Sequence, residues 1–435
     1  MNMKQIYQAG LAASAIGLVL TIIGLVMGHP ALWQNAFVFT AVTFTIGAGY
    51  WPELKNYQFT IWIITGFIAA MIYGPRLTHW GEFNLANKWI VIFVIQATMF
   101  SMGTKLSIQD FVGVVKMPKA VFAGAFCQFT IMPLLGFTLT MVFNFPPEIS
   151  MGIILVGSCA SGLSSNVMCY IANANLALSV SVTALCTILS AIVTPVWVKV
   201  LGSSFVDINF YAMIINVVQI VIVPIGAAIL HDYLKNYAKS KAKLVFTVLS
   251  GISALWLIYM LAGGWQILFG ELQGNVRSVA GLTNFFAAGI LWAYVYTYFT
   301  NVWPKISDLM PAVSMTGIIF FTTTAAANGR DNLVQVGLLL VLAMAIHNIG
   351  GYIIGYLVSR FIFRLDEQSS RTISIEVGLQ NGGMASGLAA AMGKLATVGL
   401  AAAVVTPIGN VTGSILANYW RKKKIDNPKH VAQEA

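Results

Sequence analysis

One stretch carries side chains suited to ion chemistry: residues 373–387, ISIEVGLQNGGMASG. A carboxylate, Glu376, is followed by the amides Gln380 and Asn381 and by several glycines. Of the 14 Asp and Glu residues, only Glu376 falls inside an apolar run. A carboxylate in hydrocarbon needs a cation, a partner or water. Because amide oxygens also ligate hard cations, the pattern predicts an ion site rather than a protonated Glu that braces helix packing.

A second polar interruption occurs in the first half of the chain, at residues 157–166, GSCASGLSSN. The next apolar run carries Ser179 and Thr183, which are four residues apart on one helical face. A helix broken within a membrane frees carbonyls that suit Na⁺ and presents N-termini that suit anions. Asn166, Ser179 and Thr183 are therefore candidate ion ligands, and Gln128 is a further amide within an apolar run.

These residues allow two other interpretations. Small-residue packing between helices explains the glycines and serines, but not Asn166, Glu376 or the two amides after it. His347 with Ser161 or Ser386 predicts an intramembrane Ser–His hydrolase, which leaves Glu376 without a role. The sequence contains no zincin motif, Walker loop or dinucleotide-binding fingerprint.

Composition indicates a polytopic all-α membrane protein. The 435 residues are 58% hydrophobic and 9% charged, whereas soluble domains carry about 25% charge. The net charge of +10 does not indicate nucleic-acid binding, because Lys and Arg cluster in short loops and in the tail. The first apolar run, to Met27, is too long for a typical signal peptide. We expect membrane lipid as a partner and no nucleic acid.

About fourteen apolar runs are near or above the ~20 residues that cross a bilayer. They lie near 9–28, 34–50, 58–74, 88–104, 119–143, 149–172, 176–198, 209–231, 244–268, 279–299, 309–327, 333–358, 372–393 and 398–420. An even number places both termini on one side. All but six of the 24 Lys and Arg then fall on that side, which predicts that both termini are cytoplasmic. The six are Arg76, Lys88, Lys199, Arg277, Arg330 and Lys394.

The two halves of the chain look related. After each interruption the next run carries a Thr-Pro pair, Thr194-Pro195 and Thr406-Pro407, with an offset of 406 − 194 = 212 residues. Seven runs per half would invert one half relative to the other. Interrupted helices in corresponding positions of an inverted repeat indicate a transporter site.

From about Trp62 to Trp420, these motifs resemble the bile acid:sodium symporter family, in particular its bacterial members. The stretches that carry the resemblance include Gln128 to Pro133, residues 157–166 with Asn175 to Thr183, His347 to Tyr352 and Ile375 to Asn381. The resemblance implies a ten-helix inverted repeat, a core domain and a panel domain, two crossing discontinuous helices and two Na⁺ sites. Carried over by motif, one site would use Ser165, Asn166, Ser179, Thr183 and Glu376. The other would use Gln128, Glu376, Gln380 and main-chain oxygens near Val377 and Leu379.

For the substrate, the resemblance implies an organic anion near the crossing, at Ser161, Leu163, Ser164, Asn381, Gly382 and Asn410. Leu163 stands where relatives often have a small hydroxyl residue, and Gly409 stands where a bulkier residue is usual. The chain also has about four more runs than ten. Either 9–50 and 244–299 are the additions, or 9–28 is the first family helix and the insertion recurs in both halves.

The predicted domains are extra and panel helices at 1–116, the first core half at 117–205 and panel helices with an inserted pair at 206–332. The second core half is at 333–420 and a basic tail at 421–435. We expect crossing helices near 157–166 and 378–387. The predicted function is Na⁺-coupled symport of a bile acid-like or small carboxylate anion across a bacterial inner membrane. An H⁺-coupled carboxylate permease with Glu376 as the proton carrier is the main alternative, and a channel or a binder without transport are others.

Overall fold

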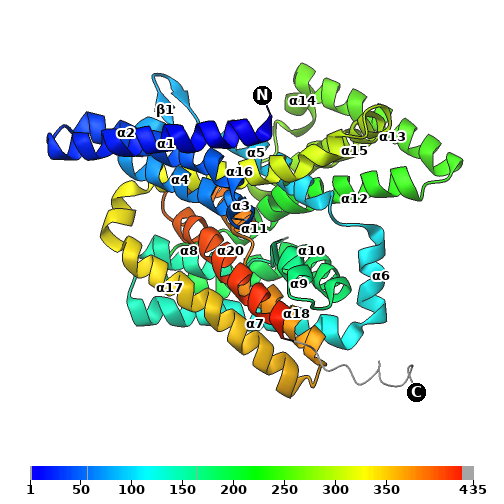
Figure 1. Ribbon diagram of the computed structural model, residues 1–435. Coiled ribbons are helices and arrows are strands. Elements are labelled where there is room, and N and C mark those ends of the chain that lie inside the picture. Colours follow the sequence, from blue (N-terminus) through cyan, green and yellow to red (C-terminus); the bar gives the residue numbers. More distant parts are fainter. Residues whose placement is uncertain (1, 56, 163, 424–435) are drawn as a thin grey trace.

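The computed structural model describes residues 2–55, 57–162 and 164–423, and the chain there is almost entirely α-helical (Figure 1). Eleven of the described helices are long and apolar enough to cross a membrane, or twelve if the bent pair α5 (Lys88–Gly103) and α6 (Ile108–Lys116) is one span. The chain is therefore a multi-pass membrane protein. The predicted count of fourteen is not confirmed, because it requires counting two interrupted helices that are too short to cross alone.

The N-terminal helices α1 (Met3–Val26) and α2 (Pro30–Gly47) form a hairpin. Gly10, Gly17 and Gly24 recur every seven residues on the face of α1 that touches α2. A Cβ on Gly24 would lie 2.6 Å from the Trp33 backbone nitrogen, so this close approach requires glycine. The chain then continues through η1 (Ala48–Tyr50) and α3 (Pro52–Lys55).

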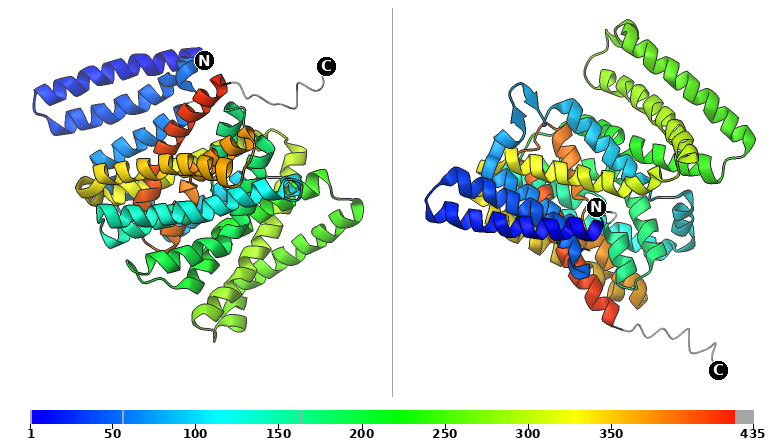
Figure 2. Two further views of the ribbon diagram at one scale, coloured as in Figure 1. Left: turned by 90° about the horizontal axis from the view of Figure 1, so that it is seen from below. Right: turned by 45° about the horizontal axis from the view of Figure 1, so that its top comes forward.

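A second hairpin lies on the opposite side of the molecule (Figure 2). It consists of α13 (Ser240–Tyr259), the π-helical turn η4 (Met260–Gly264), α14 (Trp265–Phe269) and α15 (Gly274–Val302). Trp256 Nε1 donates to Asn284 Oδ1 at 2.9 Å within the hairpin, and α15 packs against α12 (Val223–Asn236), which lies outside the hairpin. Both hairpins are thus attached at the periphery, and many of their large apolar side chains are exposed.

The body contains the remaining elements of the first half. They are α4 (Gln58–Tyr73), η2 (Gly74–Leu77), the antiparallel strands β1 (His79–Trp80) and β2 (Phe83–Asn84), α5, α6, α7 (Pro118–Phe143), α8 (Pro147–Ser158), α9 (Ser164–Ile171) and α10 (Leu176–Gly202). The bend between α5 and α6 is 59°. Ser107 and Asp110 form a capping box that starts α6.

The second half of the body follows. It contains α11 (Phe210–Val217), the π-helical turn η3 (Val218–Ile222), α12 (Val223–Asn236), α16 (Ile306–Asn328), α17 (Arg330–Leu357), the π-helical turn η5 (Val358–Ile362), α18 (Glu367–Gly378), α19 (Gly382–Ala391) and α20 (Gly399–Lys422). The helices α8, α18 and α19 are almost completely buried, although their sequences are rich in Gly and Ser. Small side chains let neighbouring helices enclose them.

Candidate functional site

Two interrupted helices meet at the centre of the body. Helix α8 ends at Ser158 before α9 begins at Ser164, and α18 ends at Gly378 before α19 begins at Gly382. Between the breaks, Ser161 pairs with Gln380 as an isolated antiparallel bridge. Gly162 N donates to Leu379 O at 3.2 Å, and Asn381 N donates to Ala160 O at 3.1 Å. The two breaks therefore satisfy part of each other's freed backbone, as burial away from water requires.

Side chains satisfy the carbonyls that end the first half-helix. Thr194 Oγ1 donates to Ser158 O at 2.6 Å, and Gln128 Nε2 donates to Cys159 O at 2.8 Å. The hydroxyl of Thr194 thus has a structural role at the first break, which the Thr-Pro pattern alone did not indicate.

The carbonyls that end α18 are held in the same manner. Gln380 Nε2 donates to Val377 O at 2.6 Å, and Asn348 Nδ2 donates to Gly378 O at 2.7 Å. Unpaired carbonyls at a buried helix end are costly. The amides therefore fix the direction in which the break presents its main-chain oxygens.

Glu376 is completely buried, and both of its carboxylate oxygens accept hydrogen bonds from hydroxyl groups. Oε1 lies 2.6 Å from Ser165 Oγ and 2.5 Å from Ser179 Oγ. Oε2 lies 2.5 Å from Ser161 Oγ and 2.9 Å from Thr183 Oγ1. The hydroxyls come from the first break, from the start of α9 and from α10, whereas the carboxylate comes from α18. One polar cluster thus joins elements about two hundred residues apart in sequence.

The amide oxygen of Asn166 completes this cluster. Asn166 Oδ1 lies 2.7 Å from Ser179 Oγ and 3.4 Å from Thr183 Oγ1. The Ser179 and Thr183 hydroxyls each have one proton but face two acceptors, Asn166 Oδ1 and the Glu376 carboxylate. The cluster therefore holds more oxygen lone pairs than protons to satisfy them. One carboxylate with hydroxyl and amide oxygens is a donor set for a hard cation such as Na⁺.

The described part of the chain contains no comparable cluster of side chains that would bind a transition metal. No group of three or more His, Cys, Asp or Glu side chains gathers there, and the four cysteines are each buried and unpaired. The cluster around Glu376 is thus chemically distinct from a zinc or copper site.

The other predicted ion residues form a second group next to the first. Gln128 Nε2 donates to Gln380 Oε1 at 2.9 Å as well as to Cys159 O, and Gln128 Oε1 is buried without a partner. Leu379 O accepts from Gly162 N, and Val377 O accepts from Gln380. Among the described residues, the side-chain hydrogen bonds of Glu376 all go to the hydroxyl cluster rather than to this group. Its assignment to both ion sites stays a prediction.

The predicted substrate residues are distributed around the crossing. Asn381 Oδ1 accepts from Met384 N at 2.9 Å and so caps α19. A Cβ on Gly382 would lie 2.0 Å from Thr406 Oγ1, so α19 begins in direct contact with α20. Asn410 Nδ2 is buried without a partner.

The other three predicted substrate residues differ in their positions. Ser161 is directed at Glu376, so its hydroxyl belongs to the carboxylate cluster. Ser164 begins α9, whereas Leu163 lies outside the described residues.

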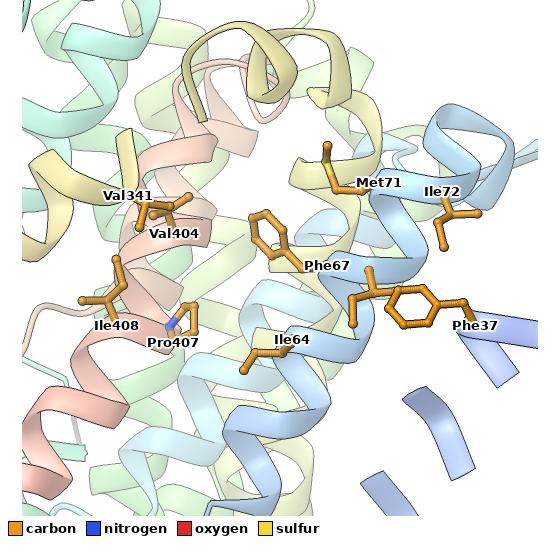
Figure 3. Close-up of a pocket in the computed structure, with 10 residues that line it drawn as sticks. Phe37, Ile64, Phe67, Met71, Ile72, Val341, Val404, Pro407 and Ile408 are labelled. Carbon is orange, nitrogen blue, oxygen red and sulfur yellow. The ribbon is translucent and has the colours of Figure 1, made fainter. Parts of the chain in front are cut away.

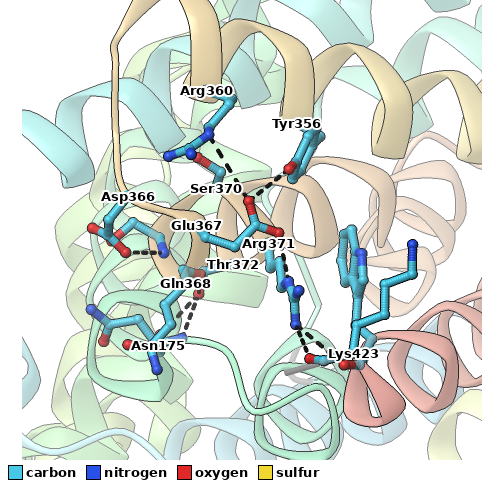
Figure 4. A network of polar contacts seen from close by, with 12 residues as sticks. Asn175, Tyr356, Arg360, Asp366, Glu367, Gln368, Ser370, Arg371, Thr372 and Lys423 are labelled. Atoms are coloured by element: carbon cyan, nitrogen blue, oxygen red, sulfur yellow. Dashed lines mark hydrogen bonds and ion pairs between the residues drawn. The ribbon is translucent and has the colours of Figure 1, made fainter. Parts of the chain in front are cut away.

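The start of α18 is anchored by a buried arginine (Figure 4). Arg371 Nε donates to Glu367 Oε1 at 2.8 Å, and its Nη1 donates to Trp420 O at 3.2 Å and Lys423 O at 3.3 Å. One residue further, Thr372 Oγ1 accepts from Asn175 N at 2.9 Å. The guanidinium satisfies carbonyls at the C-terminal end of α20. The helix that carries Glu376 is therefore tied to α20 and to the start of α10.

An apolar pocket of about 370 Å³ lies between α4 and the pair α17 and α20 (Figure 3). It is lined only by apolar side chains: Phe37, Ile64, Phe67, Ile68, Met71, Ile72, Val341, Val404, Pro407 and Ile408. Gly409 of α20 contacts Leu379 at the crossing instead. The pocket and the crossing therefore lie on different faces of α20, and the pocket offers no group that would bind a carboxylate.

His347 does not form a dyad with either candidate serine. His347 Nε2 contacts Met132 O at 3.1 Å, whereas Ser161 Oγ contacts Glu376 and Thr183. His347 therefore supplies no base to either serine that the hydrolase interpretation invoked.

Buried interrupted helices that cross around a carboxylate are typical of secondary transporters. The sequence model of the Sodium Bile acid symporter family matches residues 90–271. The sodium-dependent transporter YocS of Bacillus subtilis (strain 168), described as uncharacterized, is 30% identical over 366 residues, which are 84% of this chain and 91% of the relative.

Two further relatives have more specific names. The probable sodium/metabolite cotransporter BASS1 of Arabidopsis thaliana, chloroplastic, is 28% identical over 370 residues, which are 85% of this chain and 75% of the relative. The ileal sodium/bile acid cotransporter of Homo sapiens is 28% identical over 222 residues, or 47% and 62% of the two chains. The chain belongs to the sodium bile acid symporter family, whose members named here are transporters rather than enzymes.

Proposed function

We propose that this protein is a Na⁺-coupled symporter of an organic anion. The observation that carries the proposal is the cluster of a buried carboxylate, four hydroxyls and an amide oxygen at the point where the interrupted helices cross. A buried carboxylate without a cation is costly. A cation bound there is thus favoured, and its binding is linked to the arrangement of both breaks.

Two Na⁺ ions are proposed per transport cycle. The first would be held by Ser165, Asn166, Ser179, Thr183 and Glu376, and the hydroxyl of Ser161 extends this set. The second would be held by Gln128, Gln380, Glu376 and the oxygens near Val377 and Leu379. The buried, unpartnered Gln128 Oε1 supports this assignment, because an orphaned acceptor is satisfied by a cation. Two Na⁺ against one carboxylate leave a charge of about +1 in a site of low dielectric.

A monoanionic substrate would neutralise that charge. The N-terminus of α19 and the beginning of α9 meet at the crossing, and each helix N-terminus is equivalent to roughly +0.5 charge. Asn381 stands between the second ion group and α19, and Asn410 offers an amide nitrogen without a partner. These groups suit a carboxylate, and they support a bile acid-like or small carboxylate substrate.

Alternating access would be a movement of the core (117–205 and 333–420) against the panel. We propose that the fold is a fourteen-span inverted repeat. It would lie in a bacterial cytoplasmic membrane with both termini on the cytoplasmic side. One connection between these units supports the proposal. Gly329 is the one residue between α16 of the panel and α17, which continues into the core. A second pocket, of about 430 Å³, lies between the two units and is lined by Ala86, Val91, Asn328, residues 390–393, Leu395 and Ala396.

A thermal-unfolding screen of carboxylates against the purified protein, in Na⁺ and in K⁺ at equal ionic strength, tests the proposal. A ligand at 100 times its Kd adds ~2.7 kcal/mol to stability. A substrate should stabilise the protein more in Na⁺ than in K⁺. Equal stabilisation in both salts, increasing as the pH falls, would instead favour the H⁺-coupled permease with Glu376 as proton carrier.

A further inference from the structure

Asn348 is a completely buried amide on α17 that contacts two other helices. Its Nδ2 donates to Gly378 O of α18 at 2.7 Å, and its Oδ1 accepts from Thr412 Oγ1 of α20 at 2.5 Å. A longer contact of 3.3 Å joins Nδ2 to Tyr352 Oη on the next turn of α17. Both ends of the Asn348 amide are therefore used, and each end holds a different helix.

The carbonyl that Asn348 holds lies within the ion-binding segment. Gly378 is two residues after Glu376 and two residues before Gln380. It is also the last residue of α18, where its carbonyl has no partner within the helix. The bond from Asn348 therefore fixes the end of α18 relative to α17. A shift of this end would displace the carboxylate and the oxygens of Val377 and Leu379 together.

The first break has a matching arrangement. Gln128 lies on α7, the helix before the first interrupted helix, and donates to Cys159 O, one residue after the end of α8. The two amides are separated by 348 − 128 = 220 residues, and the carbonyls that they hold, Cys159 O and Gly378 O, are separated by 378 − 159 = 219 residues. At both breaks, an amide from the preceding helix thus holds a carbonyl within one residue of the end of the first half-helix. This recurrence favours a role at the break over incidental packing.

The second contact of Asn348 leads to the anion side of the crossing. Thr412 is two residues after Asn410 on α20, and its hydroxyl donates to Asn348 Oδ1. We propose that Asn348 is a positioning residue that couples the sodium-binding end of α18 to α20. A displacement of Gly378 is transmitted through the amide to Thr412, and hence to the helix that carries Asn410. The inference rests on the proposed Na⁺-coupled function.

The test is a Na⁺ titration of the purified full-length protein in a K⁺ background at constant ionic strength, read by the thermal-unfolding midpoint. Asn348→Leu keeps the approximate volume but removes both hydrogen bonds. We expect the Na⁺ concentration for half-maximal stabilisation to rise about tenfold or more, since a buried carbonyl is left unpaired. Thr412→Val removes only the link to α20, and we expect a rise of about threefold. Tyr352→Phe, which removes only the longer contacts, is the matched control and should shift less than twofold.

The outcomes separate this inference from the proposed function. If the wild type shows no Na⁺-specific stabilisation, the proposed function is contradicted. If the wild type responds and Asn348→Leu lowers the midpoint equally in Na⁺ and K⁺, with the half-saturating concentration unchanged, Asn348 has only a structural role and the inference is overturned. Should Asn348→Leu fail to fold, Thr412→Val decides, and an unchanged half-saturating concentration in that variant overturns the inference.

Discussion

Thr183→Val is the substitution that isolates one oxygen of the proposed first Na⁺ site. The side chain is almost completely buried, and valine keeps its shape while it removes the hydroxyl. That hydroxyl lies 2.9 Å from Glu376 Oε2 and 3.4 Å from Asn166 Oδ1. A hydrogen bond to a charged group contributes about 1.5–3 kcal/mol, or roughly 10- to 150-fold in affinity. Because the sodium-free protein also loses a contact to Oε2, we expect the lower end, about tenfold weaker Na⁺ binding.

The assay is the Na⁺ dependence of the thermal-unfolding midpoint, with K⁺ as the balancing cation. Thr187→Val is a matched control one turn further along α10. The Thr187 hydroxyl is also buried, but it donates only to Thr183 O at 2.7 Å, a local contact within the helix. The control should shift the half-saturating Na⁺ concentration less than about twofold, since such local bonds contribute little. An unchanged value in Thr183→Val, or equal shifts in both variants, would refute the assignment of Thr183.

Three further predictions concern the anion, the fold and the orientation. Asn381→Ala should weaken carboxylate binding roughly 10- to 150-fold while Na⁺ still binds, as measured by calorimetry with Na⁺ first and carboxylate second; equal loss of both would count against the crossing as the anion site. Arg371→Leu should lower the unfolding midpoint in both Na⁺ and K⁺, because it leaves carbonyls of α20 unpaired, whereas the exposed Arg421→Leu should not. Glu82→Cys, in the exposed turn between β1 and β2, should be labelled in intact cells by an impermeant thiol reagent, because the native cysteines are buried; labelling only in opened cells would reverse the proposed orientation.

The positions of both breaks follow from local sequence. Clusters of Gly, Ser and Asn inside apolar segments mark places where a membrane helix can be interrupted, and α8 and α18 end within the two stretches of this kind. The hydroxyls of Ser179 and Thr183 were identified by their helical spacing, and the structure places both next to Glu376. The spacing of these two polar residues thus predicted correctly that they share one face of a helix.

Residues whose partners are main-chain atoms could not be identified in this way. Asn348 donates to a carbonyl, and a carbonyl leaves no trace in a sequence. Ser161 was assigned to the substrate, because its approach to Glu376 depends on how the two breaks cross. The helix α6 has a local signal in its capping residues Ser107 and Asp110, but it is too short to appear as a long apolar run.

The number of spans illustrates a different difficulty. Length and apolarity identify helices that cross a membrane in one piece. The pairs α8–α9 and α18–α19 are interrupted, so neither half satisfies that criterion. The interruptions that form the proposed ion site therefore also remove the long apolar helices by which membrane spans are counted.

The most direct test of the central claim, that Glu376 is the charge that binds Na⁺, is a Na⁺ titration of purified wild-type protein and Glu376→Gln, read by thermal unfolding in a K⁺ background. The variant should fold, because the four surrounding hydroxyls can both donate to and accept from an amide. For the wild type, Na⁺ at 100 times its Kd should add ~2.7 kcal/mol per site. Glu376→Gln should show no Na⁺-specific stabilisation. Retention of half or more of the wild-type effect would contradict the claim.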